Sequence, residues 1–214
     1  MAQNFDQSLL KVNISPRVKA GFAWTEAACA NLKQIHSALG VRLVHEHLSE
    51  SLEGDWLWTT RPNATLGIKV ADCTAVLIYG VRKSQEEFVA ALHAGWRGTA
   101  NRIFQNFFDE VEPQEFTAWL SPRICQSHFE VGPEVLEELG LSAARFSKSG
   151  LGDRSYLDLG ALQKLQLEEL GARVISHPLC TYHQNEMFSF RRSGKLETGR
   201  HWAFIELMKA DQIL

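Results

Sequence analysis

The sequence lacks several features that would place it in a protein class at once. Its 214 residues contain no apolar run close to the roughly 18 residues of a membrane-spanning helix. The N-terminal stretch has no apolar segment typical of a signal peptide. A formal net charge of -3 and the absence of a basic cluster argue against a nucleic-acid partner or a charged membrane surface. We therefore expect a cytoplasmic protein without a nucleic-acid or membrane partner.

Cysteine is scarce and irregularly spaced. The four cysteines, Cys29, Cys73, Cys125 and Cys180, form no C-x-x-C pair. A chain of this length does not need disulfides to hold its core, and this spacing is not a disulfide framework. We expect free thiols, which are then available as metal ligands or nucleophiles.

Internal repeats and low-complexity segments are also absent, and 45% of the residues are hydrophobic, enough for one core. Ala28, Leu32 and Ile35 fall at helical spacing within 25–37. The mixture lacks strict alternation of strand and helix, so it predicts an α+β or layered α/β domain. The apolar patterns predict strands at 17–24, 67–79, 87–93, 115–120, 173–177 and 201–208, and further helices at about 100–111, 133–139 and 157–170.

Two residues interrupt the most apolar predicted strand, 67–79. Asp72 and Cys73 lie in its middle. A free cysteine is usually a buried core residue. A carboxylate, however, is costly to bury in a central strand unless it is paired or linked to a metal. Both a core thiol and a functional thiol remain possible from the pattern alone.

His93 ends another predicted strand, directly before a turn with Gly95 and Gly98. Strand ends that lead into loops often carry catalytic groups, and Arg97 adds a planar cation suited to phosphate. Other histidines are less informative. His45 and His47 form an H-x-H pair, which is more typical of a solvated strand face than of a metal site.

Arginines cluster near the C-terminal end, in FSFRR at 188–192 and TGR at 198–200. The surrounding aromatic residues argue for partial burial, and such arginines could hold an anion. A solvated surface is the alternative.

These strings occur together in a recognisable order. QIH, VADCTAVLIYG, ALHAGWRG, FEVGPEV, YLDL, CTY, FSFRR and TGR follow one another over about residues 34–208. The series resembles the YfiH-like laccase-domain family, once described as multicopper polyphenol oxidases and now as purine nucleoside phosphorylases. HAGWRG with an upstream ADC is the most specific part of the resemblance.

The resemblance implies a single laccase-like domain over residues 1–214, with mixed sheets packed between helices, similar to a toxin deamidase fold. It implies that His36, Cys73 and His93 bind zinc. The implied activity is phosphorolysis of adenosine, inosine, guanosine and methylthioadenosine, with adenosine deamination. The partners would be nucleoside and phosphate, and the protein a monomer or small homo-oligomer.

Two imidazoles and a thiolate would leave zinc one position for water or substrate, as in catalytic sites. Cys73, His93 and Asp72 are therefore the expected catalytic residues. The expected substrate-binding residues are Arg97, Asp55, Arg191 and Arg200. Similar proteins also carry an aspartate at the position of Asp55, where it would orient a ligand or substrate, or close a turn.

The sequence also departs from the family pattern. GFAWTEAA stands where the family has a string rich in arginine and glycine, and several tens of residues before QIH are missing relative to the family. SPRICQ at 121–126 replaces the usual Gly-Pro-x-Ile-Gly stretch. We therefore expect the metal ligands to be better preserved than the substrate pocket.

Three alternatives remain. A copper-dependent polyphenol oxidase would need many H-x-H pairs, whereas this chain has eight histidines and one such pair, although a single Cys–His–His site could bind copper. A metal-free hydrolase would use Cys73 as nucleophile and His93 as base. A non-catalytic metal-binding protein is the third.

Overall fold

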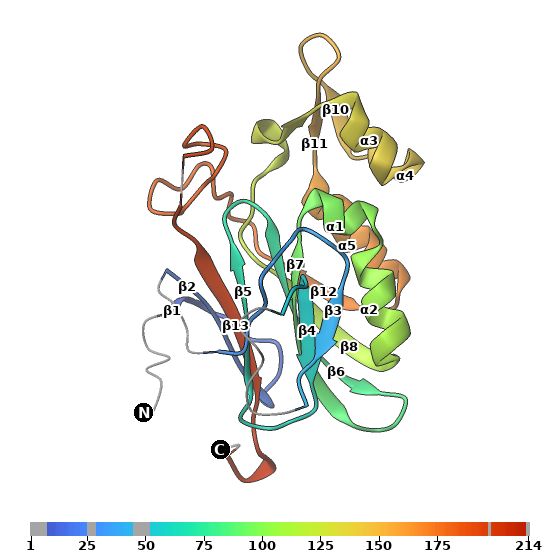
Figure 1. Cartoon of the computed structure of the whole chain (residues 1–214), viewed down its shortest axis with the longest axis vertical. Coiled ribbons are helices and arrows are strands. Elements are labelled where there is room, and N and C mark those ends of the chain that lie inside the picture. Colours follow the sequence, from blue (N-terminus) through green and yellow to red (C-terminus); the bar gives the residue numbers. More distant parts are fainter. Residues whose placement is uncertain (1–7, 25–28, 45–51, 197, 213–214) are drawn as a thin grey trace.

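Two large β-sheets dominate the computed structural model, which describes residues 8–24, 29–44, 52–196 and 198–212 (Figure 1). The first sheet is antiparallel throughout, in the order β1-β2-β13-β5. Its strands are β1 (Ser8–Lys11), β2 (Val18–Ala23), β13 (His201–Leu207) and β5 (Thr65–Val70).

The second sheet is mixed, in the order β12-β8-β6-β7-β4-β3. Its inner pairs are antiparallel, and the two outer pairs, β12 with β8 and β3 with β4, are parallel. Its strands are β3 (Gly40–Arg42), β4 (Trp56–Thr59), β6 (Thr74–Arg82), β7 (Glu87–Ala94), β8 (Pro113–Leu120) and β12 (Arg173–Ser176).

A third, small antiparallel sheet forms one end of the molecule together with two short helices (Figure 1). None of the helices in the described part of the chain is both long and apolar enough to cross a membrane. The remaining elements are β9 (Glu130–Val131), β10 (Ser147–Ser149), β11 (Ser155–Leu157), α1 (Trp96–Ala100), α2 (Ile103–Val111), α3 (Pro133–Leu139), α4 (Leu141–Ala144), α5 (Leu159–Glu169), and the 3-10 turns η2 (Gln126–His128) and η3 (Ala210–Gln212).

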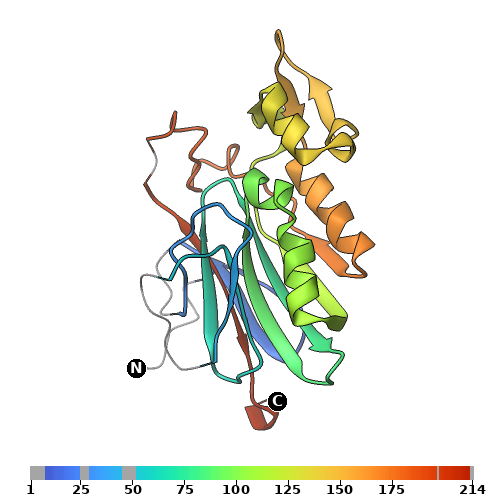
Figure 2. The ribbon, with the colours of Figure 1, turned by 45° about the vertical axis from the view of Figure 1, so that its right-hand side comes forward.

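The layers of the fold are sheet, sheet and helix. One buried cluster joins Phe22 and Ile68 of the first sheet to Leu77 of the second. A second cluster lies on the other face of the six-stranded sheet, which helices α2 and α5 cover (Figure 2). It includes Phe107 of α2 and Leu167 of α5. The expected α+β class is therefore confirmed. The expectation of sheets packed between helices holds on one side only, because α2 and α5 cover one face of the six-stranded sheet and the four-stranded sheet covers its other face.

The predicted strand at 67–79 is two strands. β5 belongs to the first sheet and β6 to the second, so the chain passes between the sheets at residues 71–73. Asp72 has a positive φ of 79° at this crossing, which no regular strand allows. The polar pair Asp72 and Cys73 thus marks a break that a count of apolar residues does not reveal.

The predicted helix at 25–37 is also wrong for its described part, residues 29–37; residues 25–28 lie outside the described chain. The backbone of Ala30 pairs with Leu66, and that of Lys33 pairs with Glu53. Leu32 is buried in the cluster between the sheets. Strand partners therefore satisfy the backbone groups that a helix would have paired internally.

Several other predictions are confirmed with small shifts in their ends. Pro133 begins α3, which runs to Leu139 as expected, and β13 accounts for the predicted strand at 201–208. The predicted helix at 100–111 is divided into α1 and α2. Thr99 lies inside α1 and donates a hydrogen bond to the Gly95 carbonyl.

Candidate metal centre and its supporting network

The three predicted metal ligands come from three separate segments and meet at one point. His36 lies in the loop before β3, Cys73 in the crossing from β5 to β6, and His93 near the end of β7. One ligand atom from each lies within 4.8 Å of the others. The two imidazole rings are 4.7 Å apart between centroids and nearly perpendicular, at 82°.

The cluster has a buried side and an open side. His93 is 3% exposed, Cys73 is half-buried and His36 is exposed. Gly95 closes around the ligands, since a Cβ there would lie 3.2 Å from the Cys73 Sγ and 3.5 Å from the His36 Cδ2. A small molecule would therefore approach from the side of His36.

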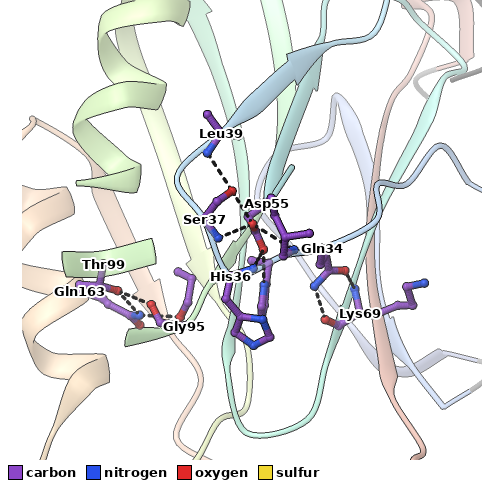
Figure 3. A network of polar contacts seen from close by, with 12 residues as sticks. Gln34, His36, Ser37, Leu39, Asp55, Lys69, Gly95, Thr99 and Gln163 are labelled. Carbon is purple, nitrogen blue, oxygen red and sulfur yellow. Dashed lines mark hydrogen bonds and ion pairs between the residues drawn. The ribbon is translucent and has the colours of Figure 1, made fainter. Parts of the chain in front are cut away.

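Asp55 forms hydrogen bonds with the segment that carries His36 and with His93, and Figure 3 shows it beside His36 and Ser37. It is fully buried, and its Oδ1 lies 2.8 Å from the His93 Nδ1. The same carboxylate accepts hydrogen bonds from the backbone amides of His36 (3.0 Å) and Ser37 (2.6 Å) and from the Ser37 hydroxyl (2.7 Å). Asp55 therefore fixes the His93 ring and the backbone at His36 from a fully buried position.

Electrostatics in the metal-free cluster favour a thiolate beside an imidazolium. Burial on its own raises the pKa of Cys73, but His93 and His36 outweigh it and lower that pKa to about 6. Burial lowers the pKa of His93, but Cys73 and Asp55 outweigh it and raise that pKa to about 9. The cluster thus presents the deprotonated sulfur that a metal needs.

Asp72, the expected acid or base, is engaged in the crossing between the sheets. One carboxylate oxygen accepts from the Thr181 hydroxyl at 2.5 Å, and the other accepts from the Arg191 backbone amide at 2.7 Å. Its own carbonyl accepts from the Ile124 amide at 3.0 Å. Asp72 therefore links the crossing that carries Cys73 to the loops that contain Ile124, Thr181 and Arg191.

The donor set fits a zinc ion. Tetrahedral zinc bound to sulfur and imidazole nitrogen requires ligand atoms roughly 3–4 Å apart, a separation that small side-chain rotations within this cluster can reach. His93 contacts Asp55 through Nδ1, which leaves its Nε2 free to bind a metal. A metal-binding histidine usually bonds a carboxylate through its other ring nitrogen in this way.

Comparisons with known proteins bear on this geometry. The family model for the multi-copper polyphenol oxidoreductase laccase matches residues 10–208. The chain belongs to this laccase-domain family.

Relatives in the family carry a different activity in their names. The purine nucleoside phosphorylase of Deinococcus radiodurans is 31% identical over 207 residues, covering 91% of this chain and 76% of that protein. The purine nucleoside phosphorylase YfiH of Escherichia coli K12 is 34% identical over 185 residues, covering 83% and 73%.

A solved structure supports the same fold. The crystal structure of the hypothetical protein YfiH from Bacillus licheniformis aligns with a TM-score of 0.82 at 21% identity, over 96% of this chain and 98% of that one. The laccase-domain fold is thus shared over almost the whole chain.

The expected anion-binding arginines of this laccase-domain chain differ in their surroundings. Arg97 is exposed on α1 and stacks over the Trp96 ring at 4.5 Å. Arg191 is half-buried and donates to the Glu130 carbonyl at 2.9 Å. Arg200 is half-buried and donates to the Gly199 carbonyl at 2.7 Å. Arg191 is tied closest to the cluster, through its backbone contact with Asp72.

A buried glutamine, which sequence reasoning missed, holds the strand ends that carry two of the ligands (Figure 3). The Gln163 Oε1 accepts from the Thr74 hydroxyl at 2.6 Å, and its Nε2 donates to the Ala94 carbonyl at 2.7 Å. Thr74 follows Cys73, and Ala94 follows His93. The predicted H-x-H pair, His45 and His47, lies outside the described residues.

Replacing Gln163 with leucine should destabilise the fold and loosen metal binding together. The change leaves the Ala94 carbonyl and the Thr74 hydroxyl buried without this partner, which costs about 1–3 kcal/mol. Chemical denaturation and a chelator competition would measure the two effects. Gln166→Leu, the same change at a half-buried position of α5, should alter stability by less than about 0.5 kcal/mol.

In protein stripped of metal, Cys73 should react with iodoacetamide as a low-pKa thiol. The rate at this residue should rise through pH of about 6 and level off above it, because its pKa lies near that value. Burial and the neighbouring Cys180 raise the pKa of Cys125, which should need a higher pH and serves as an internal control. Peptide-resolved mass spectrometry separates the two, and identical profiles would contradict the account.

Proposed function

We propose that the chain is a zinc-dependent purine nucleoside phosphorylase. The observation that carries this proposal is the Asp55-oriented cluster of His36, Cys73 and His93, found in a chain 31% and 34% identical to proteins of that name. Adenosine, inosine, guanosine and methylthioadenosine are the proposed substrates, and deamination of adenosine is a proposed second activity.

Three protein ligands suit a catalytic site better than a structural one. When bound, zinc supplies Lewis-acid chemistry at a fourth position and lowers the pKa of water that it binds. His93 is buried and fixed by Asp55, whereas His36 forms the open edge. The proposed binding place for the nucleoside is therefore the side of His36.

In phosphorolysis, an oxygen of phosphate forms a bond to the ribose C1′ while the C1′–N9 bond to the purine breaks. The incoming phosphate needs positive charge, and the departing base needs a proton. We assign phosphate binding to Arg191, with Arg97 and Arg200 as further candidates. Asp72 is the candidate for protonating the departing purine, and it must release one of its present hydrogen bonds to do so.

In deamination, water would add to the purine C6, and ammonia would leave after protonation. Asp72 would again be the candidate acid or base, because a carboxyl group is needed to move the proton. The phosphate-binding arginines would have no part in this reaction. Their substitution should therefore reduce phosphorolysis more than deamination.

A second candidate function rests on a specific observation. Cys73, His93 and Asp55 form a thiol–imidazole–carboxylate series, with lowered pKa at the thiol and raised pKa at the imidazole. This is the arrangement of a cysteine hydrolase, in which Cys73 would attack a carbonyl carbon directly. That chemistry needs no metal and no His36.

Replacing His36 with asparagine separates the two functions. Asparagine tolerates the positive φ of 59° at this position better than alanine does, so the backbone should persist. We expect the variant to hold about one zinc per chain fewer than the wild type, and its inosine phosphorolysis to be reduced at least about 100-fold. Elemental analysis and hypoxanthine release with phosphate are the measurements.

Leu39→Ala, an exposed change in the same segment, is the control and should behave as wild type. Amidase or esterase activity that survives both a chelator and His36→Asn would favour the hydrolase. Copper in place of zinc, with phenol oxidation and no phosphorolysis, would favour the polyphenol oxidase.

A further inference from the structure

A second cluster of metal-binding side chains lies outside the centre described above. Cys125, His128 and His183 each direct one ligand atom to a common point, with all these atoms within 4.8 Å of one another. None of the three belongs to the first cluster, and none is used by the proposed reaction. The two histidines bring their Nε2 atoms to 2.6 Å.

The cluster is built from two copies of one local motif. The sequence has C-x-x-H at 125–128 (CQSH) and again at 180–183 (CTYH). In each, the histidine amide donates to the carbonyl of the cysteine three residues earlier, at 3.1 Å in the first and 3.2 Å in the second. In both motifs a tight turn therefore joins the cysteine to the histidine, residue types that bind zinc.

Backbone contacts hold the two turns side by side. Arg123 and Cys180 form a parallel bridge, and the Thr181 amide donates to the Arg123 carbonyl at 3.0 Å. The Cys125 amide donates to the Cys180 Sγ at 3.2 Å, so a second sulfur adjoins the cluster. These contacts do not involve the histidine side chains, and they fix the backbone that carries Cys125, His128 and His183.

A neighbouring arginine stiffens the second turn. The Arg192 guanidinium donates to the carbonyls of Thr181 (2.7 Å), Tyr182 (3.0 Å) and Gln184 (3.0 Å). The Tyr182 ring stacks on His128, with centroids 3.9 Å apart and planes at 12°. His128 is thus held from one face, and its Nε2 points to His183.

The distance between the two histidines needs an explanation. At 2.6 Å the two Nε2 atoms are within hydrogen-bonding distance. Tetrahedral zinc would instead hold the two nitrogens roughly 3.3 Å apart. His183 is exposed, so a small rotation of its side chain provides the difference without disturbing the frame.

We propose that Cys125, His128 and His183 form a second, structural zinc site, with the adjoining Cys180 sulfur as its fourth protein ligand. A thiolate with two imidazoles suits zinc among the common divalent ions, since magnesium and calcium prefer oxygen ligands. The site would clamp the loop at 121–129 to the loop at 180–193. Both loops also bind Asp72 through Ile124, Thr181 and Arg191, so the clamp would fix one wall of the first centre.

Metal counting on the full chain tests this proposal separately from the catalytic one. Purified under reducing conditions and freed of excess zinc, wild type should carry about two zinc ions per chain. The double variant H128Q/H183Q should carry about one, and Cys73→Ala should also carry about one. His177→Gln, which changes a neighbouring histidine outside both clusters, should keep the wild-type count.

Cobalt identifies the ligands of the second site. In a Cys73→Ala background, bound Co²⁺ should show a thiolate-to-metal charge-transfer band that is lost in Cys125→Ser. The double variant should also melt at a lower temperature than wild type with zinc present, and at the same temperature once both are stripped of zinc.

One zinc in wild type that the double variant retains would overturn the second site and leave a hydrogen-bonded histidine pair. A Cys125–Cys180 disulfide with one zinc per chain would overturn it as well. Failure of inosine phosphorolysis with two zinc ions bound would overturn only the proposed function. If Cys73→Ala does not fold, the difference in zinc content between wild type and H128Q/H183Q is sufficient to test the second site.

Discussion

The metal centre depends on the buried carboxylate of Asp55. A carboxylate removed from water is tolerated only where donors surround it, and here backbone amides, a hydroxyl and the His93 imidazole do so. Burial raises its pKa, but the bonds to His93 and Ser37 outweigh this and lower it. The same hydrogen bonds that stabilise the buried charge of Asp55 also fix the backbone at His36 and the orientation of the His93 ring.

The second constraint is the passage of the chain between two sheets. Strand β5 ends in one sheet and β6 begins in the other, so Cys73 lies in the connection between the sheets and not within a regular ladder. Asp72 secures this passage through its contacts with two loops, and Gln163 secures the following strand ends. Ligands from distant parts of the sequence can therefore be held without a dedicated metal-binding loop.

Sequence patterns predicted most strands and α3, because local periodicity and a proline start are local signals. They failed at 25–37, where helical spacing coincides with a segment whose backbone pairs with strands. His36 was assigned by family resemblance, since spacing could not select it among eight histidines. The role of Gln163 could not be predicted, because glutamine is common in amphipathic helices and only the structure shows that this one is buried. The repeated C-x-x-H motif was present in the sequence, but only the fold brings its two copies together.

The central claim is that Asp55 organises the zinc ligands, and the zinc affinity of Asp55→Asn tests it most directly. Asparagine keeps the size of the side chain but removes its charge and one acceptor oxygen. We predict zinc binding weaker by about 10–100-fold in chelator competition, with the fold retained. Glu87→Gln, a change to a carboxylate paired with Arg17 away from the centre, should leave affinity unaltered. Equal affinity in wild type and Asp55→Asn would contradict the account.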